Sequence, residues 1–251
     1  MNATLAEASA LAQEIRRSAA GVSDLEIVLC PPFTALSKVA EQLKGSRISL
    51  GAQDLYWHPQ GPYTGEISPT QLKDLGCRFC IVGHSEGRHL LRETDADVQK
   101  KLRAGIDQNL TMILCVGETL EEREKGRTWS VIEGQLKGAL QGVEPARLSP
   151  QVVIAYEPVW AIGTGLNATG LQAEEVHAQI RSWLAGQIGR NGAESIRIQY
   201  GGSVKPDNVS ELASQPDIDG FLVGGASLTA TDFLSIIELA RQVKGSQCCT
   251  G

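Results

Sequence analysis

The sequence has few of the residues that mark several classes of protein. Only six of its 251 residues are cysteine, too few for a disulfide scaffold of this length. Ten prolines and 27 glycines are not enough for a collagenous or disordered chain. No apolar run approaches the roughly 20 residues that a membrane-spanning helix needs. These shortages exclude a fibre, a linker and a membrane protein.

Clustered positive charge is also missing. The chain carries 23 basic and 29 acidic residues, a net charge of −6, and no basic stripe runs along any segment. This balance argues against nucleic acid as a partner and leaves a small polar substrate open. Residues 1–20 show no basic segment followed by an apolar one, so we expect no signal peptide and a cytoplasmic location.

The cysteines give little support to a redox or metal site. Cys77 and Cys80 have the CxxC spacing, but no second pair completes a zinc site. Cys30, Cys77, Cys80 and Cys115 lie in or beside apolar runs, where cysteine behaves as a small buried hydrophobe. We therefore favour structural cysteines over a redox or metal role.

Short apolar runs alternate with longer amphipathic stretches along the whole chain. The predicted strands are residues 25–30, 48–52, 78–82, 112–116, 152–156, 196–200 and 218–223. The predicted helices include residues 5–19, 94–109, 129–141, 171–189 and 231–243, with N-caps at Thr94, Thr169 and Thr229. The runs are continuously apolar, as in strands buried on both faces of a parallel sheet.

This alternation fits a doubly wound open sheet or a closed (β/α)8 barrel. No GxGxxG turn follows the first run, which weakens the dinucleotide-binding version of the open sheet. Length and the number of units favour the barrel, with residues 1–251 as a single domain. Only seven runs are present where a closed barrel has eight strands, so we predict a (β/α)8 barrel that lacks its first strand.

Chemistry in such a barrel collects at the carboxyl ends of the strands. The third run is followed by Gly83-His84-Ser85-Glu86, which places an imidazole just before a helical turn. Backbone N–H groups of that turn would keep His84 neutral and able to donate to a developing oxyanion. A surface histidine near a helix start is an equally good interpretation of this segment alone.

The fifth run is followed by Glu157 and an apolar loop tip between a proline and glycines. Closure of this loop as a lid would exclude water and raise the basicity of Glu157 toward that of a general base. The alternative is a strand-end glutamate that caps a loop. An apolar tip on an exposed loop costs hydration, which favours the lid.

The last two runs end in paired glycines, Gly201-Gly202 before Ser203 and Gly224-Gly225. Such backbone can approach a ligand closely, and its N–H groups can cradle a phosphate without lysine or arginine. A base, a neutral electrophile, a lid and a phosphate cradle together describe proton abstraction beside a carbonyl. The residues thus predict a phosphosugar isomerase acting through an enediol.

These motifs are similar to those of the triosephosphate isomerases, and the resemblance covers essentially the whole chain. It implies a TIM-type barrel that interconverts dihydroxyacetone phosphate and D-glyceraldehyde 3-phosphate, in glycolysis and gluconeogenesis, without cofactor or metal. By the resemblance, Glu157 moves the proton and His84 polarises the carbonyl oxygens. The other implied site residues are Gly163, Ser203, Gly224 and Gly225, which bind phosphate, and Ser85 and Glu86 in support.

The resemblance also implies a homodimer. The long loop Gln53–Glu66 is similar to the loop that family members insert into a neighbouring subunit. A plain surface loop is the simpler alternative, although long loops in compact domains usually have a function.

Three positions depart from the family pattern. The family's first strand ends in Asn-Trp-Lys before a Met-Asn pair, whereas this chain opens at Met1-Asn2; we expect a start site assigned too late. Gly87 stands where the family usually has arginine, and Gly170 where it usually has proline. The chain without that lysine leaves open a non-catalytic phosphosugar-binding homologue. Another phosphate-binding barrel with different chemistry is disfavoured by the Glu157 segment.

Overall fold

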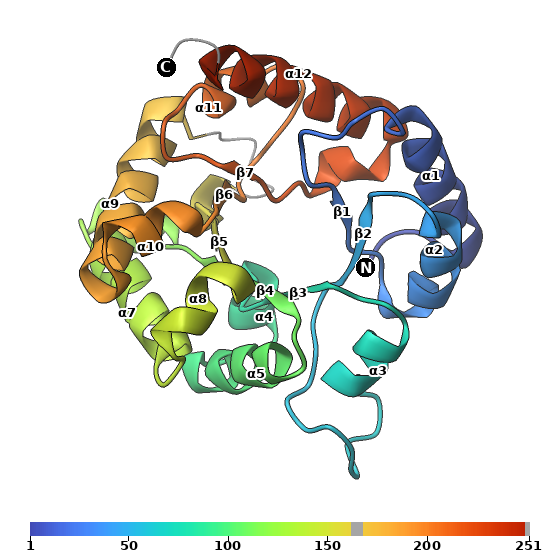
Figure 1. Cartoon of the computed structure of the whole chain (residues 1–251). Helices are drawn as coiled ribbons and strands as arrows, with labels where there is room; N and C mark the ends of the chain where they lie inside the picture. The colour runs from blue at the N-terminus through green and yellow to red at the C-terminus, as the bar shows by residue number, and fades with distance from the viewer. Residues whose placement is uncertain (162–167, 249–251) are drawn as a thin grey trace.

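The computed structural model of the protein describes residues 1–161 and 168–248. Within them, seven parallel strands follow one another around a curved sheet in chain order, as Figure 1 shows. The strands are β1 (Val28–Leu29), β2 (Ser49–Ala52), β3 (Phe79–Val82), β4 (Thr111–Val116), β5 (Val152–Tyr156), β6 (Ile198–Tyr200) and β7 (Gly220–Phe221). Each of the seven predicted strands is confirmed, and so is the parallel barrel-type architecture with seven strands.

Strand length follows position in the sheet. The central pair, β4 and β5, runs in register from Met112 with Val152 to Val116 with Tyr156, and both strands are buried almost throughout. By contrast, β1 and β7 have two half-buried residues each. In the residues that the structure describes, no pairing joins β1 to β7, and the two strands stand apart in Figure 1. The edge strands are thus the least covered part of the sheet.

Helices surround the sheet on its outer side (Figure 1). They are α1 (Leu5–Ser18), α2 (Leu36–Leu43), α3 (Pro69–Asp74), α4 (Ser85–Leu90), α5 (Asp95–Asp107), α6 (Leu120–Glu124), α7 (Thr128–Leu140), α8 (Pro145–Gln151), α9 (Gly170–Ile188), α10 (Arg190–Ser195), α11 (Val209–Ala213) and α12 (Ala230–Cys248), with short 3-10 turns η1 (Phe33–Ala35), η2 (Val159–Ala161) and η3 (Gly225–Leu228). The predicted caps are confirmed: Thr94 and Thr169 form capping boxes, and the Thr229 hydroxyl accepts the Asp232 N–H.

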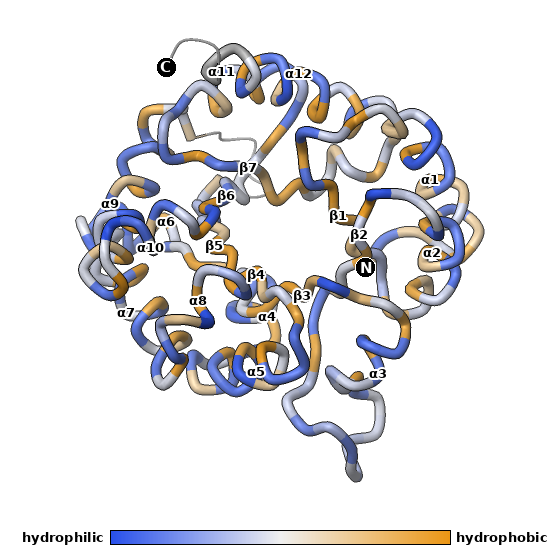
Figure 2. The backbone as a smooth tube through the Cα atoms, in the orientation of Figure 1, coloured by the Kyte–Doolittle hydropathy of each residue, from blue (hydrophilic) through white to orange (hydrophobic). Residues whose placement is uncertain are grey.

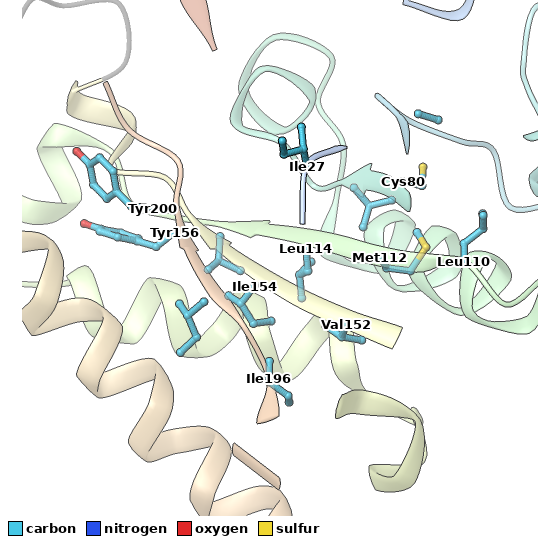
Figure 3. Packing of buried hydrophobic residues seen from close by; sticks show 14 of the residues in the cluster. Ile27, Cys80, Leu110, Met112, Leu114, Val152, Ile154, Tyr156, Ile196 and Tyr200 are labelled. Atoms are coloured by element: carbon cyan, nitrogen blue, oxygen red, sulfur yellow. The ribbon is translucent and has the colours of Figure 1, made fainter. Parts of the chain in front are cut away.

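The strands bury both faces. Met112, Leu114 and Ile154 belong to the larger core between sheet and helices, part of which Figure 3 shows. The alternate residues Ile113 and Val153 belong to a second cluster on the inner face. Figure 2 shows hydrophobic residues along the strands and hydrophilic residues on the outer helices. Two buried faces explain why the strand sequences are continuously apolar.

The cysteines that the structure describes in full are free thiols. Cys77, Cys80 and Cys115 are buried and Cys30 is partly exposed. Burial raises the pKa of Cys30 to about 12 and that of Cys77 to about 11, which suppresses thiolate chemistry. Among the described residues, no group of three His, Cys, Asp or Glu side chains could hold a metal ion. None of the described helices is both long and apolar enough to span a membrane.

A histidine is buried completely between α9 and the sheet. His177 is 0% exposed, and its Nδ1 lies 3.0 Å from the carbonyl oxygen of Asp217. Burial lowers its pKa to about 4, with Arg181 and Lys244 adding to the effect. The ring is therefore neutral, with its proton on Nδ1, which donates to the carbonyl.

This histidine makes the stability depend on pH. The unfolded chain takes up the proton near the ordinary pKa of about 6.5 and the folded chain only near 4, so the free energy of unfolding falls as the pH drops through that window. We expect His177→Gln to remove this part of the pH dependence. Urea unfolding of the native protein and the variant between about pH 7 and pH 4.5 measures the difference. Equal losses of stability in both proteins would contradict the assignment.

Candidate active site

Four of the predicted site residues lie at one end of the sheet. His84, Glu157, Ser203 and Gly224 each follow the carboxyl end of a strand, namely β3, β5, β6 and β7. Parallel pairing brings these ends to the same rim. The structure therefore places the predicted residues on one face of the barrel.

Glu157 is the centre of this rim. Its side chain is only 2% exposed, and both carboxylate oxygens have partners. Oε1 lies 2.9 Å from Nε2 of His84, and Oε2 accepts the backbone N–H of Ser85 at 2.9 Å. The Glu157 backbone N–H donates to the Val116 carbonyl at 2.8 Å, which continues the β4–β5 ladder beyond the strand. A buried carboxylate is thus fixed at side chain and backbone.

His84 is the N-cap of α4. Its Nδ1 accepts the N–H of Glu86 at 3.3 Å, so the proton of the neutral ring lies on Nε2, facing Glu157. The predicted helix donor is present, but the sequence did not predict a carboxylate in direct contact. Burial lowers the pKa of His84, yet the hydrogen bond and charge of Glu157, with Glu86 and Glu93, outweigh it and the net pKa is raised. Protonation of Nδ1 would lose the Glu86 hydrogen bond, so the observed geometry corresponds to the neutral ring.

Sequence reasoning missed the glycine that makes room for Glu157. A Cβ on Gly117 would lie 1.7 Å from the Glu157 carbonyl oxygen. Gln135 fixes this glycine from both sides, since its side-chain oxygen accepts the Gly117 N–H at 2.8 Å and its amide donates to the Gly117 carbonyl at 3.1 Å. The only signal in the sequence is a glycine directly after an apolar run, a pattern too common to be specific.

A second missed residue is Glu118, which is 0% exposed. Its Oε1 accepts from the Tyr156 hydroxyl at 3.2 Å, from Trp160 Nε1 at 3.0 Å and from Arg123 at 3.0 Å. Arg123 also lies 4.7 Å from the centre of the Trp160 ring. This carboxylate therefore ties together the residues on both sides of Glu157. Only the tertiary contacts reveal this role of Glu118. In the sequence, an acidic residue just before a helix suggests a solvent-exposed helix start.

The predicted phosphate-binding backbone lies beside the base. The Gly201 N–H donates to the Tyr156 carbonyl at 2.7 Å, and a Cβ on Gly201 would meet Glu157 Cγ at 3.0 Å. Asn208 holds the next turn by donating to the Ser203 carbonyl at 2.8 Å.

The second glycine pair is open to solvent. Gly224 and Gly225 are exposed, have no atom within 4 Å of an added Cβ, and lead into η3. Gly163, which the resemblance also assigns to phosphate, lies outside the described residues. Of the predicted residues, His84, Ser85 and Glu157 are in direct contact. The Glu86 N–H holds His84, whereas the Glu86 side chain is exposed.

Comparison with known proteins identifies the family of the chain. The triosephosphate isomerase family model matches residues 1–240. The triosephosphate isomerase of Rhodopirellula baltica is 53% identical over 240 residues, covering 96% of this chain and 94% of the relative. That of Syntrophotalea carbinolica is 51% identical over 238 residues, covering 95% and 94%.

A solved structure has the same fold at substantial identity. The crystal structure of triosephosphate isomerase from Bartonella henselae superposes with a TM-score of 0.87 at 40% identity, covering 96% of this chain and 95% of the other. The relatives support triose-phosphate isomerase function and do not favour the non-catalytic alternative. Family model, relatives and fold therefore agree that the chain belongs to the triosephosphate isomerase family.

Proposed function

We propose that Glu157 and His84 are the catalytic pair that interconverts dihydroxyacetone phosphate and D-glyceraldehyde 3-phosphate. The observation that carries this proposal is the 2.9 Å contact between the buried Glu157 carboxylate and Nε2 of His84. It brings a base and a hydrogen-bond donor within reach of one small substrate. Moving a hydrogen from one carbon of the substrate to the next needs both the base and the hydrogen-bond donor.

Glu157 supplies the base. With dihydroxyacetone phosphate bound, the carboxylate takes a proton from C1, and the electron pair left behind forms the C1–C2 double bond of an enediolate. The electron pair of the C2 carbonyl moves onto its oxygen, which then takes the hydroxyl proton of O1. The same carboxyl group returns its proton to C2, which gives the aldehyde at C1. Its near-complete burial limits exchange of that proton with water.

His84 stabilises the negative charge that develops on the substrate oxygens. The Glu86 N–H at Nδ1 keeps the donor proton on Nε2. A substrate oxygen that takes the place of Glu157 at Nε2 removes the contact that raises the pKa of His84. Burial then favours the neutral ring, which donates a hydrogen bond without giving up its proton.

The phosphate group is bound at the backbone of Ser203, Gly224 and Gly225. Their place at the carboxyl ends of the last two strands, with η3 beginning at Gly225, supports this assignment. By the resemblance, Gly163 adds a further N–H. Ser85 supports the pair through its backbone N–H to Glu157. The proposed reaction requires no metal or cofactor.

We also infer that residues 1–251 form one domain and that the protein acts in the cytoplasm, in glycolysis and gluconeogenesis. The continuous strand order supports the first inference. The free thiols at Cys30, Cys77, Cys80 and Cys115 suit a reducing compartment.

We further infer a homodimer formed through the loop Gln53–Glu66. This loop projects from the body of the molecule between β2 and α3 (Figure 1). Its aromatic rings pack on one another: Tyr56 stacks on Trp57 with centroids 4.0 Å apart, and His58 stacks on Tyr63 at 4.6 Å. A projecting loop with an ordered aromatic cluster is suited to insertion into a second copy.

Replacing the base tests the catalytic assignment. We expect Glu157→Gln to reduce kcat by on the order of 10³-fold, because general base catalysis is lost while the shape of the side chain is kept. Binding of inorganic phosphate should be nearly unchanged. Steady-state kinetics and calorimetry measure the two effects.

The control is Glu121→Gln, the same change at an exposed position, which should leave kcat unaltered. Full activity of Glu157→Gln would disprove the assignment. Histidine NMR reports on the variant directly, since loss of the Glu157 charge should lower the pKa of His84.

The backbone position of Glu157 is tested at Gly117. We expect Gly117→Ala to reduce kcat/KM by about 10²-fold, since the new methyl group displaces the Glu157 carbonyl and with it the carboxylate. Gly134→Ala in α7 is the matched control, because a Cβ there meets nothing within 4 Å. Equal activities of the two variants would mean that the backbone tolerates the shift.

The dimer is tested by placing a charge in the aromatic cluster. We expect Tyr63→Glu to shift the protein from dimer to monomer in sedimentation velocity, because the interface would bury an unpaired carboxylate. Leu171→Glu on α9 places the same charge at an exposed apolar position and should leave the dimer intact. A native protein that sediments as a monomer would contradict the inference.

A further inference from the structure

Three polar atoms around Tyr156 are buried without a hydrogen bond of ordinary geometry to any described residue. They are Oε2 of Glu118, Nε2 of His177 and the hydroxyl oxygen of Tyr200. Buried polar atoms are almost always satisfied in native proteins, so each such atom needs an explanation. Three such atoms in one cluster call for a single explanation.

The three residues meet at the ring of Tyr156. The Tyr156 hydroxyl donates to the other oxygen of Glu118. Its ring lies edge-on to His177, with centroids 5.8 Å apart, and to Tyr200 at 6.5 Å; the His177 and Tyr200 rings are 6.4 Å apart. Figure 3 shows the hydroxyl groups of Tyr156 and Tyr200 pointing to the same side.

The donors and acceptors are complementary to one water molecule. Nε2 of His177 is an acceptor, because Nδ1 carries the proton that is donated to Asp217. Oε2 of Glu118 is an acceptor as a carboxylate oxygen. Tyr200 is a donor, because burial raises the pKa of its hydroxyl group to about 12 and keeps it protonated, although the Ala168 amide opposes the rise. The Ala168 amide can only donate a hydrogen bond, so the hydroxyl proton of Tyr200 still lacks an acceptor.

We propose that Glu118, His177 and Tyr200 bind one buried water molecule, and that His177 is thereby a positioning residue for the isomerase reaction. The water donates its two protons to Glu118 and His177 and accepts the proton of Tyr200. Three hydrogen bonds are the usual number for a buried water. Each of the three buried atoms then has a hydrogen-bond partner.

The position of Tyr200 connects this water to the phosphate-binding turn. A Cβ on Gly202 would lie 2.2 Å from the Tyr200 hydroxyl oxygen and 2.9 Å from Pro158 Cγ. The hydroxyl therefore lies against the backbone that leads to Ser203, and beside the residue that follows Glu157. A shift of Tyr200 moves both parts of the site.

Tyr156 connects the same water to the base. Its ring contacts His177, its hydroxyl is bound to Glu118, and its backbone leads directly into Glu157. His177 touches neither substrate nor base, so its effect is on geometry. This role rests on the proposed function of Glu157 and Ser203.

Two substitutions separate the acceptor at Nε2 from the donor at Nδ1. His177→Asn keeps an N–H for the Asp217 carbonyl but has no atom at Nε2, whereas His177→Gln places its amide oxygen there and loses the donor. We expect kcat/KM to fall on the order of ten-fold in His177→Asn and to be largely retained in His177→Gln. Because asparagine also fills less of this buried position than glutamine does, the order is read together with the Tyr200→Phe variant. Equal losses in the two variants, or a larger loss in His177→Gln, would overturn the proposal.

The control is His89→Asn, the same change at an exposed histidine of α4, which should leave kcat/KM unchanged. Tyr200→Phe removes the donor to the proposed water. If the two residues share one water, the double variant His177→Asn with Tyr200→Phe should be no slower than the slower single variant. Losses that multiply would overturn the shared site.

A high-resolution crystal structure of the native protein tests the water independently of activity. Density for a water within hydrogen-bond distance of all three atoms supports the proposal, and a dry or differently bonded cluster overturns it. This readout still holds if His177→Asn does not fold. A native protein without isomerase activity would instead refute the proposed function and leave the water site standing.

Discussion

The site is organised around the burial of one carboxylate. A carboxylate shielded from water is tolerated only when both oxygens have partners, and Glu157 finds them in the Nε2 proton of His84 and the amide of Ser85. Both partners belong to the start of α4, so the position of the base also fixes that helix relative to β5. Gly117 and Gly201 complete the requirement, because a Cβ on Gly117 would collide with the Glu157 carbonyl oxygen and one on Gly201 would crowd the Glu157 side chain.

In the unliganded site, two opposing influences act on the protonation of His84. The charge of Glu157 favours an imidazolium, whereas the Glu86 amide and burial favour the neutral ring. In the proposed reaction, substrate that inserts between the pair removes the first influence and leaves the second. The proposed base then becomes available and the histidine becomes a neutral donor in the same step. The contact that stabilises the unliganded site is therefore the one that the proposed reaction must exchange.

The sequence predicted what depends on local pattern and on the parallel-barrel rule. Continuous apolar runs identify the strands, and the residues that follow them include His84 and Glu157. Gly117, Glu118 and His177 escaped this reasoning, because nothing in their own segments distinguishes a required glycine, a buried carboxylate or an internal histidine from ordinary ones. Their importance comes from neighbours distant in sequence, such as Gln135, Trp160 and Asp217. The same limit applies to the pKa of His84, whose shift comes from a residue 73 positions away.

The strands that lead to the two parts of the proposed site differ in burial. The proposed catalytic pair follows β3 and β5, whose residues are buried throughout, and proton transfer depends on placing atoms to within a fraction of an ångström. The glycines proposed for phosphate follow β7, a half-buried edge strand, and are exposed. Backbone N–H groups that bind a charged oxygen tolerate looser geometry, because the attraction falls off gradually with distance. In the proposed site, the residues packed around Tyr156 join the two regions, so the buried centre of the sheet can position a substrate whose phosphate is held at the more open edge.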